Sequence, residues 1–200
     1  MFANARGPMY TWLARNGRDN SDCGLGSSVA HLARNQLLGE NVLAVHVNYL
    51  SRGDATLLAK NRTHVVHCPR SHEYFKHRTF ERERLAKAGV NLCLGTDSLA
   101  TTLKSGKSKP ELNLFTEMRT LADNDQSVSP EEIMAMATVN GARALGLAGK
   151  TGELVKNAFA DLIAIPFDGR TNRASEAVLG HTGAVQASMI EGRWAIPPHE

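Results

Sequence analysis

Three titratable residues stand at corresponding places in this sequence, each at or near the carboxyl end of an apolar run: His46, His67 and Asp97. Imidazole and carboxylate groups can move protons or hold a divalent metal, so their recurrence at such places suggests chemistry. Burying an unpaired carboxylate costs several kcal/mol, and a metal or a histidine partner would compensate Asp97. The pattern therefore predicts that the three side chains converge on one site.

Each of these residues also has a simpler interpretation when it is taken alone. His46, within an apolar run, could be a hydrogen-bonded core histidine. Asp97, which follows Gly95 and Thr96, could simply cap a turn. The recurrence of such residues in three successive apolar runs favours a site over these separate interpretations.

Further histidines gather around the middle run. His64, His72 and His77 lie within a few residues of His67 and Cys68. Their spacing matches no zinc-ligand pattern, so we do not expect a closed zinc site there.

The apolar runs themselves are typical of parallel strands that are buried on both faces. They cover Val42–Val47, Thr63–Cys68 and Val90–Asp97, and helix patterns separate them at Asp54–Asn61 and Phe80–Ala88. This alternation predicts βα units and a parallel sheet. In a parallel α/β barrel, the loops that follow the strands form the active-site face.

The flanking segments are mostly helical in pattern. The other expected helices cover Pro8–Arg15, a segment capped by Ser27 and ended by Gly39, Leu112–Ala122, and a segment from the capping box at Ser129 to Ala144.

After residue 146 the helical pattern stops. Strands are expected at Ala160–Ile165 and Ala184–Ile190, followed by a turn at Glu191–Arg193 and a short final strand from Trp194. A boundary near Leu147 therefore separates an α/β part, residues 1–147, from a small β part, residues 148–200.

The composition indicates a globular protein and excludes several classes. Apolar residues make up 42% and charged residues 22%, which is ordinary for a globular chain. The net charge is only +3, and the basic run Lys104–Lys109 is better interpreted as a solvated loop than as a phosphate site, so no nucleic-acid partner is expected. Neither a membrane span nor a signal peptide is expected, since no apolar run is long enough. Three dispersed cysteines, Cys23, Cys68 and Cys93, favour a reducing cytoplasm.

Several motifs occur in a recognisable order. They are Val45-His46-Val47, Val65-Val66-His67-Cys68-Pro69-Arg70-Ser71, Leu94-Gly95-Thr96-Asp97-Ser98, Leu112-Asn113-Leu114-Phe115-Thr116-Glu117-Met118-Arg119, Asp161-Leu162-Ile163-Ala164-Ile165 and Ala187-Ser188-Met189-Ile190-Glu191-Gly192-Arg193-Trp194. The set resembles the amidohydrolase superfamily, in its branch of cytosine deaminases, chlorohydrolases and S-adenosylhomocysteine deaminases. The resemblance covers most of the chain. It implies an α/β fold: the C-terminal part of a TIM-like (β/α)8 metal-dependent hydrolase barrel, followed by part of a small β-sandwich.

The resemblance also implies roles for individual residues. Asp97 matches the family's metal-binding aspartate, which accepts the proton of the attacking water, and His46 matches the histidine that hydrogen-bonds the substrate or hydroxide. His67 matches a histidine that lines the pocket, and Arg70 and Ser98 are expected to bind substrate beside it. The implied reaction is hydrolysis of a C–N bond, namely deamination of a purine, pyrimidine or related ring by metal-activated water. Zinc is the expected metal, with iron as an alternative.

The family's remaining metal ligands have no match in this sequence. The family carries a His-x-His pair after its first barrel strand and a histidine and a glutamate after its fifth, but no His-x-His occurs here. We therefore expect that the chain lacks the N-terminal barrel strands, binds metal weakly or not at all, and is inactive alone. A partial barrel has an open strand edge, so self-association is also expected.

Two other functions stay open at this point. The chain could be an inactive fragment that acts only as a binding or assembly module, or a different α/β enzyme without metal. The second is disfavoured, because the sequence contains no nucleophile elbow, Walker loop or Gly-x-Gly-x-x-Gly motif.

Overall fold

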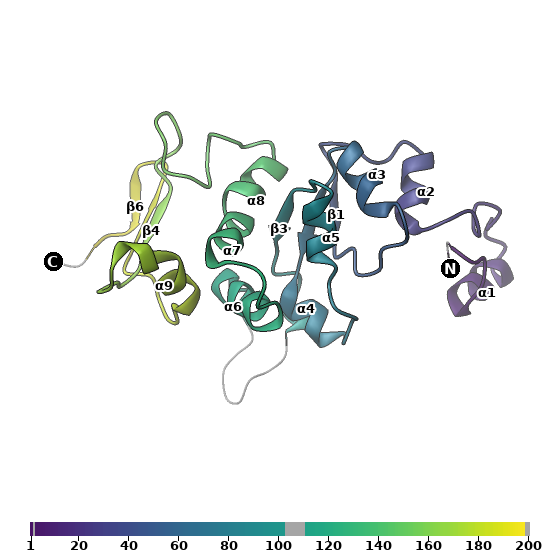
Figure 1. Cartoon of the computed structure of the whole chain (residues 1–200), viewed down its shortest axis with the longest axis horizontal. Helices are drawn as coiled ribbons and strands as arrows, with labels where there is room; N and C mark the ends of the chain where they lie inside the picture. Colours follow the sequence, from purple (N-terminus) through teal and green to yellow (C-terminus); the bar gives the residue numbers. More distant parts are fainter. Residues whose placement is uncertain (2, 103–110, 199–200) are drawn as a thin grey trace.

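The computed structural model describes residues 1, 3–102 and 111–198, so the basic run Lys104–Lys109 lies outside the described residues. The helices are α1 (Pro8–Arg15), α2 (Ser28–Arg34), α3 (Asp54–Lys60), α4 (Pro69–Tyr74), α5 (Arg82–Lys87), α6 (Leu114–Asn124), α7 (Pro130–Ala137), α8 (Val139–Ala144) and α9 (Ala174–Gly180), with 3₁₀ turns η1 (Leu99–Thr101) and η2 (Thr171–Arg173). The chain runs along its long axis from α1 at one end to the C-terminal strands at the other (Figure 1).

A parallel sheet forms the centre of the α/β part. Its strands β1 (Leu43–Val45), β2 (His64–His67) and β3 (Leu92–Leu94) pair in parallel and in sequence order. This confirms the predicted βα units. The strands are shorter than the apolar runs, because one or more residues at each end of every run lie outside the strand, and the last residues of each run belong to the loops at the carboxyl edge of the sheet.

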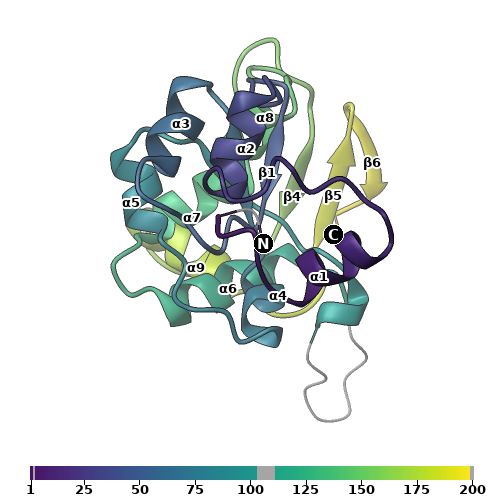
Figure 2. The same cartoon turned by 90° about the vertical axis from the view of Figure 1, so that its right-hand side faces the viewer.

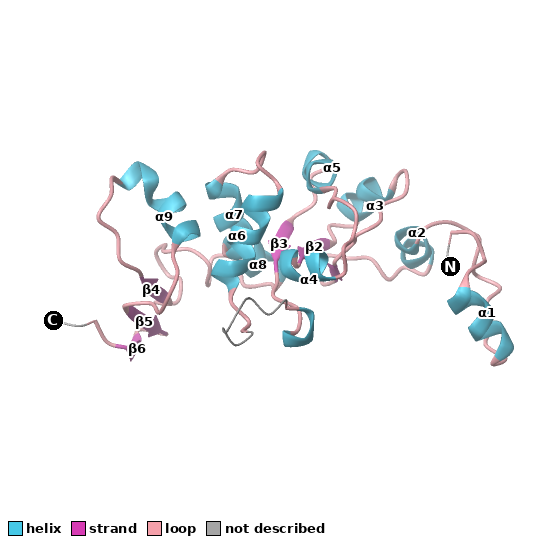
Figure 3. Ribbon diagram, turned by 90° about the horizontal axis from the view of Figure 1, so that it is seen from below, coloured by secondary structure: helices cyan, strands magenta, loops and turns pink. Residues whose placement is uncertain are grey.

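The core of this part lies between the sheet and its helices. Val65 of β2 is fully buried together with Leu58 of α3, Leu85 of α5 and Ile133 of α7. Burying each such side chain stabilises the fold by about 1.5–3 kcal/mol. Helices α3 and α5 lie to one side when the molecule is viewed from its α1 end (Figure 2). Helices α6, α7 and α8 lie between the parallel sheet and the C-terminal strands (Figure 3).

The second predicted helix ends earlier in the structure than expected. Ser27 caps α2 as predicted, since its Oγ accepts the Ala30 N–H at 3.0 Å. However, α2 ends at Arg34 rather than near Gly39, because Gln36 adopts a left-handed backbone with a φ of 56°.

The capping box at Ser129 is confirmed, but the single helix expected from it to Ala144 is wrong. It is broken into α7 and α8 at Thr138, whose φ and ψ of −129° and −94° are not helical. The Thr138 hydroxyl bonds the Met134 carbonyl at 2.7 Å, and such local side-chain bonds compete with regular helix geometry.

Two helices were not predicted. Helix α4 begins at Pro69, which the sequence pattern identified only as the end of a strand, although proline is also favoured at the first helical position. Helix α9 buries Leu179 against the core.

The C-terminal part contains a second sheet. Strands β4 (Leu162–Ala164), β5 (Ala187–Ile190) and β6 (Arg193–Ile196) are antiparallel and pair in the order β4-β5-β6. The predicted strands are confirmed, although β5 begins three residues later than expected. None of the helices in the described ranges has the length and apolar character to span a membrane.

Candidate functional site

The structure brings His46 and Asp97 together at the carboxyl edge of the parallel sheet. His46 directly follows β1, where its N–H continues the ladder to the Val66 carbonyl at 2.8 Å, and Asp97 lies three residues after β3. His46 Nε2 lies 3.8 Å from Asp97 Oδ2, although β2 separates their strands. The prediction that these two residues share one end of the sheet is confirmed.

The backbone at this meeting point is strained. His46, Val47 and Asp97 have φ values of 70°, 46° and 53°. Residues other than glycine rarely adopt a backbone conformation in this region. For a β-branched residue such as Val47 the conformation is especially costly. Strain of this kind persists only where the surrounding structure enforces it, and it clusters at functional sites.

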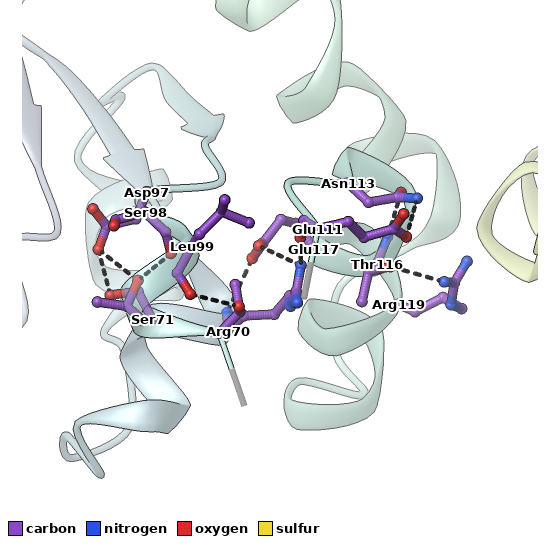
Figure 4. Close-up of polar contacts among 12 residues, drawn as sticks. Arg70, Ser71, Asp97, Ser98, Leu99, Glu111, Asn113, Thr116, Glu117 and Arg119 are labelled. Carbon is purple, nitrogen blue, oxygen red and sulfur yellow. Dashed lines mark hydrogen bonds and ion pairs between the residues drawn. The ribbon is translucent and has the colours of Figure 1, made fainter. Parts of the chain in front are cut away.

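Two hydroxyl groups also bond the Asp97 carboxylate. Ser71 Oγ donates to Oδ2 at 2.6 Å (Figure 4). Thr101 Oγ1 lies 3.2 Å from the same oxygen and 2.9 Å from the Ser98 carbonyl, so its single proton is shared between these two acceptors. These donors and the His46 imidazole provide the compensation that the partly buried Asp97 requires. Neither Ser71 nor Thr101 was singled out from the sequence, because the first is 26 residues away along the chain and only the fold reveals the contact.

Arg70 faces helix α6 rather than open solvent. Its guanidinium Nη1 donates to the Glu111 carbonyl at 2.9 Å and lies 3.7 Å from Glu117 Oε1, while its backbone N–H donates to Glu117 Oε2 at 3.0 Å (Figure 4). The predicted role of Arg70 in substrate binding stays a prediction. These contacts instead link the start of α4 to α6.

Glu117 is a buried carboxyl that sequence reasoning missed. It is fully buried, and this desolvation raises its pKa to about 7, against the opposing effects of the Arg70 N–H and guanidinium; the nearby Asp97 charge raises it further. A signal was present in the sequence. Glu117 stands four residues before Leu121, on the stripe where an amphipathic helix places apolar residues.

Ser98 has a local role in the structure. Its Oγ accepts the Ala100 N–H at 3.1 Å and so caps the turn η1 beside Asp97. Its predicted role in substrate binding stays a prediction.

His67 is buried next to the candidate site. Its ring stacks on Phe80 with a centroid distance of 3.9 Å and an interplanar angle of 3°, and it lines a cavity of about 370 Å³ that His72 and His77 share. Burial, with the nearby His72 and His46, lowers the pKa of His67 to about 3, so its ring is neutral at physiological pH. Its place in a substrate pocket stays a prediction.

The neighbouring histidines bond other groups. His72 Nδ1 pairs with Asn48 Oδ1 at 2.9 Å, and His77 Nδ1 pairs with the Tyr49 hydroxyl at 2.9 Å.

A complete catalytic zinc site is not assembled by the described residues. Catalytic zinc typically takes three protein ligands and keeps one position for water. In the ranges 1, 3–102 and 111–198, no group of three or more His, Cys, Asp and Glu side chains is placed to hold a metal ion. Asp97 and His46 offer a carboxylate and an imidazole, so the described donor set does not fit the whole metal site.

Comparison with known proteins places the chain in a family. The sequence pattern of the amidohydrolase family matches residues 20–195, and the chain therefore belongs to this family. The predicted resemblance is confirmed.

The similar proteins include several deaminases. The 5-methylthioadenosine/S-adenosylhomocysteine deaminase of Syntrophobacter fumaroxidans is 38% identical over 146 residues, which are 70% of this chain and 32% of that protein. The 5'-deoxyadenosine deaminase of Methanoregula boonei is 34% identical over 205 residues, covering 93% of this chain and 44% of that protein. This chain thus spans less than half the length of either relative.

A solved structure supports the fold. The structure of an adenosine deaminase from Xanthomonas campestris with bound zinc superposes with a TM-score of 0.73 at 25% identity, covering 93% of this chain and 42% of that one. The chain therefore has the α/β fold of metal-dependent hydrolases, as predicted.

Proposed function

We propose that this chain carries one part of the active site of a hydrolytic deaminase that acts on adenine-type nucleosides. The observation that carries the proposal is the approach of His46 and Asp97 to 3.8 Å at the carboxyl edge of a parallel sheet. The names of the matched relatives, which are deaminases of methylthioadenosine and deoxyadenosine, supply the substrate class.

We also propose how the chain divides into two structural parts. The parallel sheet is the C-terminal part of a (β/α)8 barrel, the strands β4–β6 belong to a β-sandwich, and the boundary between the two lies near Leu147. The parallel order of β1, β2 and β3 and the antiparallel order of β4, β5 and β6 both support this division.

The chemistry assigned to this chain is proton handling. Water adds to the amino-bearing ring carbon, and Asp97 accepts one proton of that water and passes it to the amino group. The carbon–nitrogen bond then breaks and ammonia leaves, while the carbon keeps the oxygen as a carbonyl and the second water proton ends on the neighbouring ring nitrogen. His46 lies beside Asp97 and donates a hydrogen bond to the oxygen that adds to the ring. The family is metal-dependent, and Asp97 is the ligand that this chain would offer to zinc or, as the alternative, to iron. Because the described donor set does not fit the whole metal site, no step of the reaction is assigned to the metal.

A hybrid protein tests this function. In it, this chain replaces the matching segment of the Methanoregula boonei deaminase, which keeps the rest of its own sequence. We expect the hybrid to release ammonia from 5'-deoxyadenosine and methylthioadenosine faster than from guanine or cytosine. The unaltered relative is the control. A folded hybrid that releases no ammonia from any of these rings would contradict the proposal and favour a binding or assembly module.

Self-association is a further part of the proposal. β1 pairs with β2 alone within the described residues, and its Leu43 and Val45 are 39% and 49% exposed. An exposed apolar strand edge is a template for pairing with another chain. We expect sedimentation velocity to show oligomers that grow with concentration, and Val45→Lys to reduce them severalfold.

The matched control for this experiment is Met9→Lys, which places the same charge on an exposed apolar residue of α1. It should leave the oligomers unchanged. Monodisperse monomer for the unaltered chain at high concentration would show that the edge of β1 does not associate.

A further inference from the structure

Every polar contact of the Asp97 side chain in the described residues goes to one of its two oxygens. Oδ2 accepts from Ser71 Oγ at 2.6 Å and faces His46 Nε2 at 3.8 Å. It also lies 3.2 Å from Thr101 Oγ1, whose single proton it shares with the Ser98 carbonyl at 2.9 Å. A hydroxyl bonded to a carboxylate at such a distance makes a strong, charge-assisted hydrogen bond. Fixing Oδ2 in this way fixes the whole carboxylate group and leaves Oδ1 to meet a reacting group.

Ser71 is well placed to fix the carboxylate, because it cannot move easily itself. It is 2% exposed and stands in the first turn of α4. The residue before this helix, Cys68, provides no side-chain cap, and Pro69 has no N–H group. The next free N–H, that of Arg70, donates to Glu117 Oε2 at 3.0 Å.

Glu117 therefore anchors the start of α4 from a different helix. Its carboxyl is fully buried in α6 and also lies 3.7 Å from the Arg70 guanidinium. The contacts form a chain from α6 through the first turn of α4 to Asp97, and Figure 4 shows Glu117, Arg70, Ser71 and Asp97 in this succession.

We propose that Ser71 is a positioning residue, anchored through Glu117, that holds the Asp97 carboxylate in the orientation needed to accept a proton from water. This inference rests on the proposed function for its catalytic meaning. The orientation of the Asp97 side chain can be measured without any enzymatic activity. The inference about Ser71 and the proposed function can therefore fail separately.

The first test measures the side-chain rotamer of Asp97 by NMR three-bond couplings in the full 200-residue chain. We expect one dominant χ1 rotamer in the unaltered chain and at least two populated rotamers in Ser71→Ala. A single unchanged rotamer in Ser71→Ala would overturn the proposal. If Ser71→Ala does not fold, Ser71→Cys leaves no cavity, since the thiol is somewhat larger than the hydroxyl, and it is a much weaker donor, so it should show the same averaging.

A matched control removes an equivalent bond elsewhere. Ser27 Oγ donates to Asp54 Oδ1 at 2.5 Å, and Asp54 is 1% exposed, so Ser27→Ala also deletes a serine–aspartate bond at a buried carboxylate, together with the cap of α2. It should destabilise the chain at least as much as Ser71→Ala, as seen in thermal unfolding, while leaving the Asp97 rotamer unchanged. A merely structural role for Ser71 predicts that both variants are destabilised and that neither changes the Asp97 rotamer.

The second test uses the hybrid deaminase. Ser71→Ala should lower kcat roughly 10- to 100-fold, the range expected for losing a hydrogen bond to a charged group, with KM changed less than about twofold. Ser27→Ala should leave kcat unchanged. Equal kcat in both variants would overturn the proposal. If the hybrid without any substitution at Ser71 has no activity, this contradicts the proposed function instead. The rotamer measurement would still decide the role of Ser71.

Discussion

Replacing Asp97 by asparagine in the hybrid deaminase is expected to lower kcat/KM for ammonia release by roughly a thousandfold, within the range typical of a lost general base. The substitution keeps the shape of the side chain, and an amide oxygen can still accept the hydrogen bond from Ser71. What it removes is the ability to take a proton and the negative charge that would help to hold the metal. The loss should therefore appear without a comparable loss of folding stability.

Initial rates of ammonia release, with thermal unfolding of the same samples, measure this effect. Asp123→Asn is the matched control, because Asp123 is an exposed carboxylate on α6, away from the site. It should keep full activity. If Asp97→Asn retained more than about a tenth of the activity, both proton acceptance and metal binding by Asp97 would be ruled out as the main contribution of this chain.

Glu117→Gln is expected to change how stability depends on pH. Burial raises the pKa of Glu117 from its ordinary 4.5 to about 7. Between these values the folded chain binds more protons at this group than the unfolded chain. Its stabilising contribution is therefore fully present below pH 4.5 and is lost as the pH rises through 7. The shift corresponds to roughly 3 kcal/mol.

Glutamine cannot ionise, so it removes this pH dependence. Relative to the unaltered chain, the variant should gain roughly 3 kcal/mol in unfolding free energy between pH 4.5 and pH 8. The charged groups that face Glu117, Arg70 from α4 and Asp97 after β3, are present in both proteins and cancel in the comparison to first order.

Urea unfolding at a series of pH values measures the difference. Glu131→Gln, at an exposed position of α7, is the control and should keep the pH dependence of the unaltered chain. Unfolding free energies of Glu117→Gln and the unaltered chain that run parallel over this range would show that Glu117 is not a strongly shifted buried acid.

The elements of the parallel sheet could be predicted because their signal is local. Continuous apolar runs near Val45, Val66 and Leu92 identify buried strands, and the helix patterns between them require parallel pairing. The break at Thr138 and the helix that begins at Pro69 could not be predicted in the same way. At Thr138, a hydroxyl bond to the backbone competes with regular helix geometry. At Pro69, the same proline ends a strand and begins a helix.

The candidate site was predicted only in part, for a related reason. His46 and Asp97 stand at strand ends, so the topology that brings the strands together also brings these residues together. The periodicity of α6 marks Glu117 as a buried position, but it does not encode the contact of Glu117 with α4 or that of Ser71 with Asp97, since these join elements that are distant in the sequence. The contact between Arg70 and Glu117 spans 47 residues of sequence, and only the packing of α4 on α6 creates it.

The most direct measurement is a crystal structure of the Asp97→Asn variant of the hybrid with methylthioadenosine bound. The slow variant should hold the substrate unreacted in the site. Our account predicts that the amino-bearing ring carbon lies within about 4 Å of the side chain at position 97 and beside His46 Nε2, at the carboxyl edge of the parallel sheet. A substrate ring bound elsewhere, with both side chains out of contact, would contradict the assignment of the active site to His46 and Asp97.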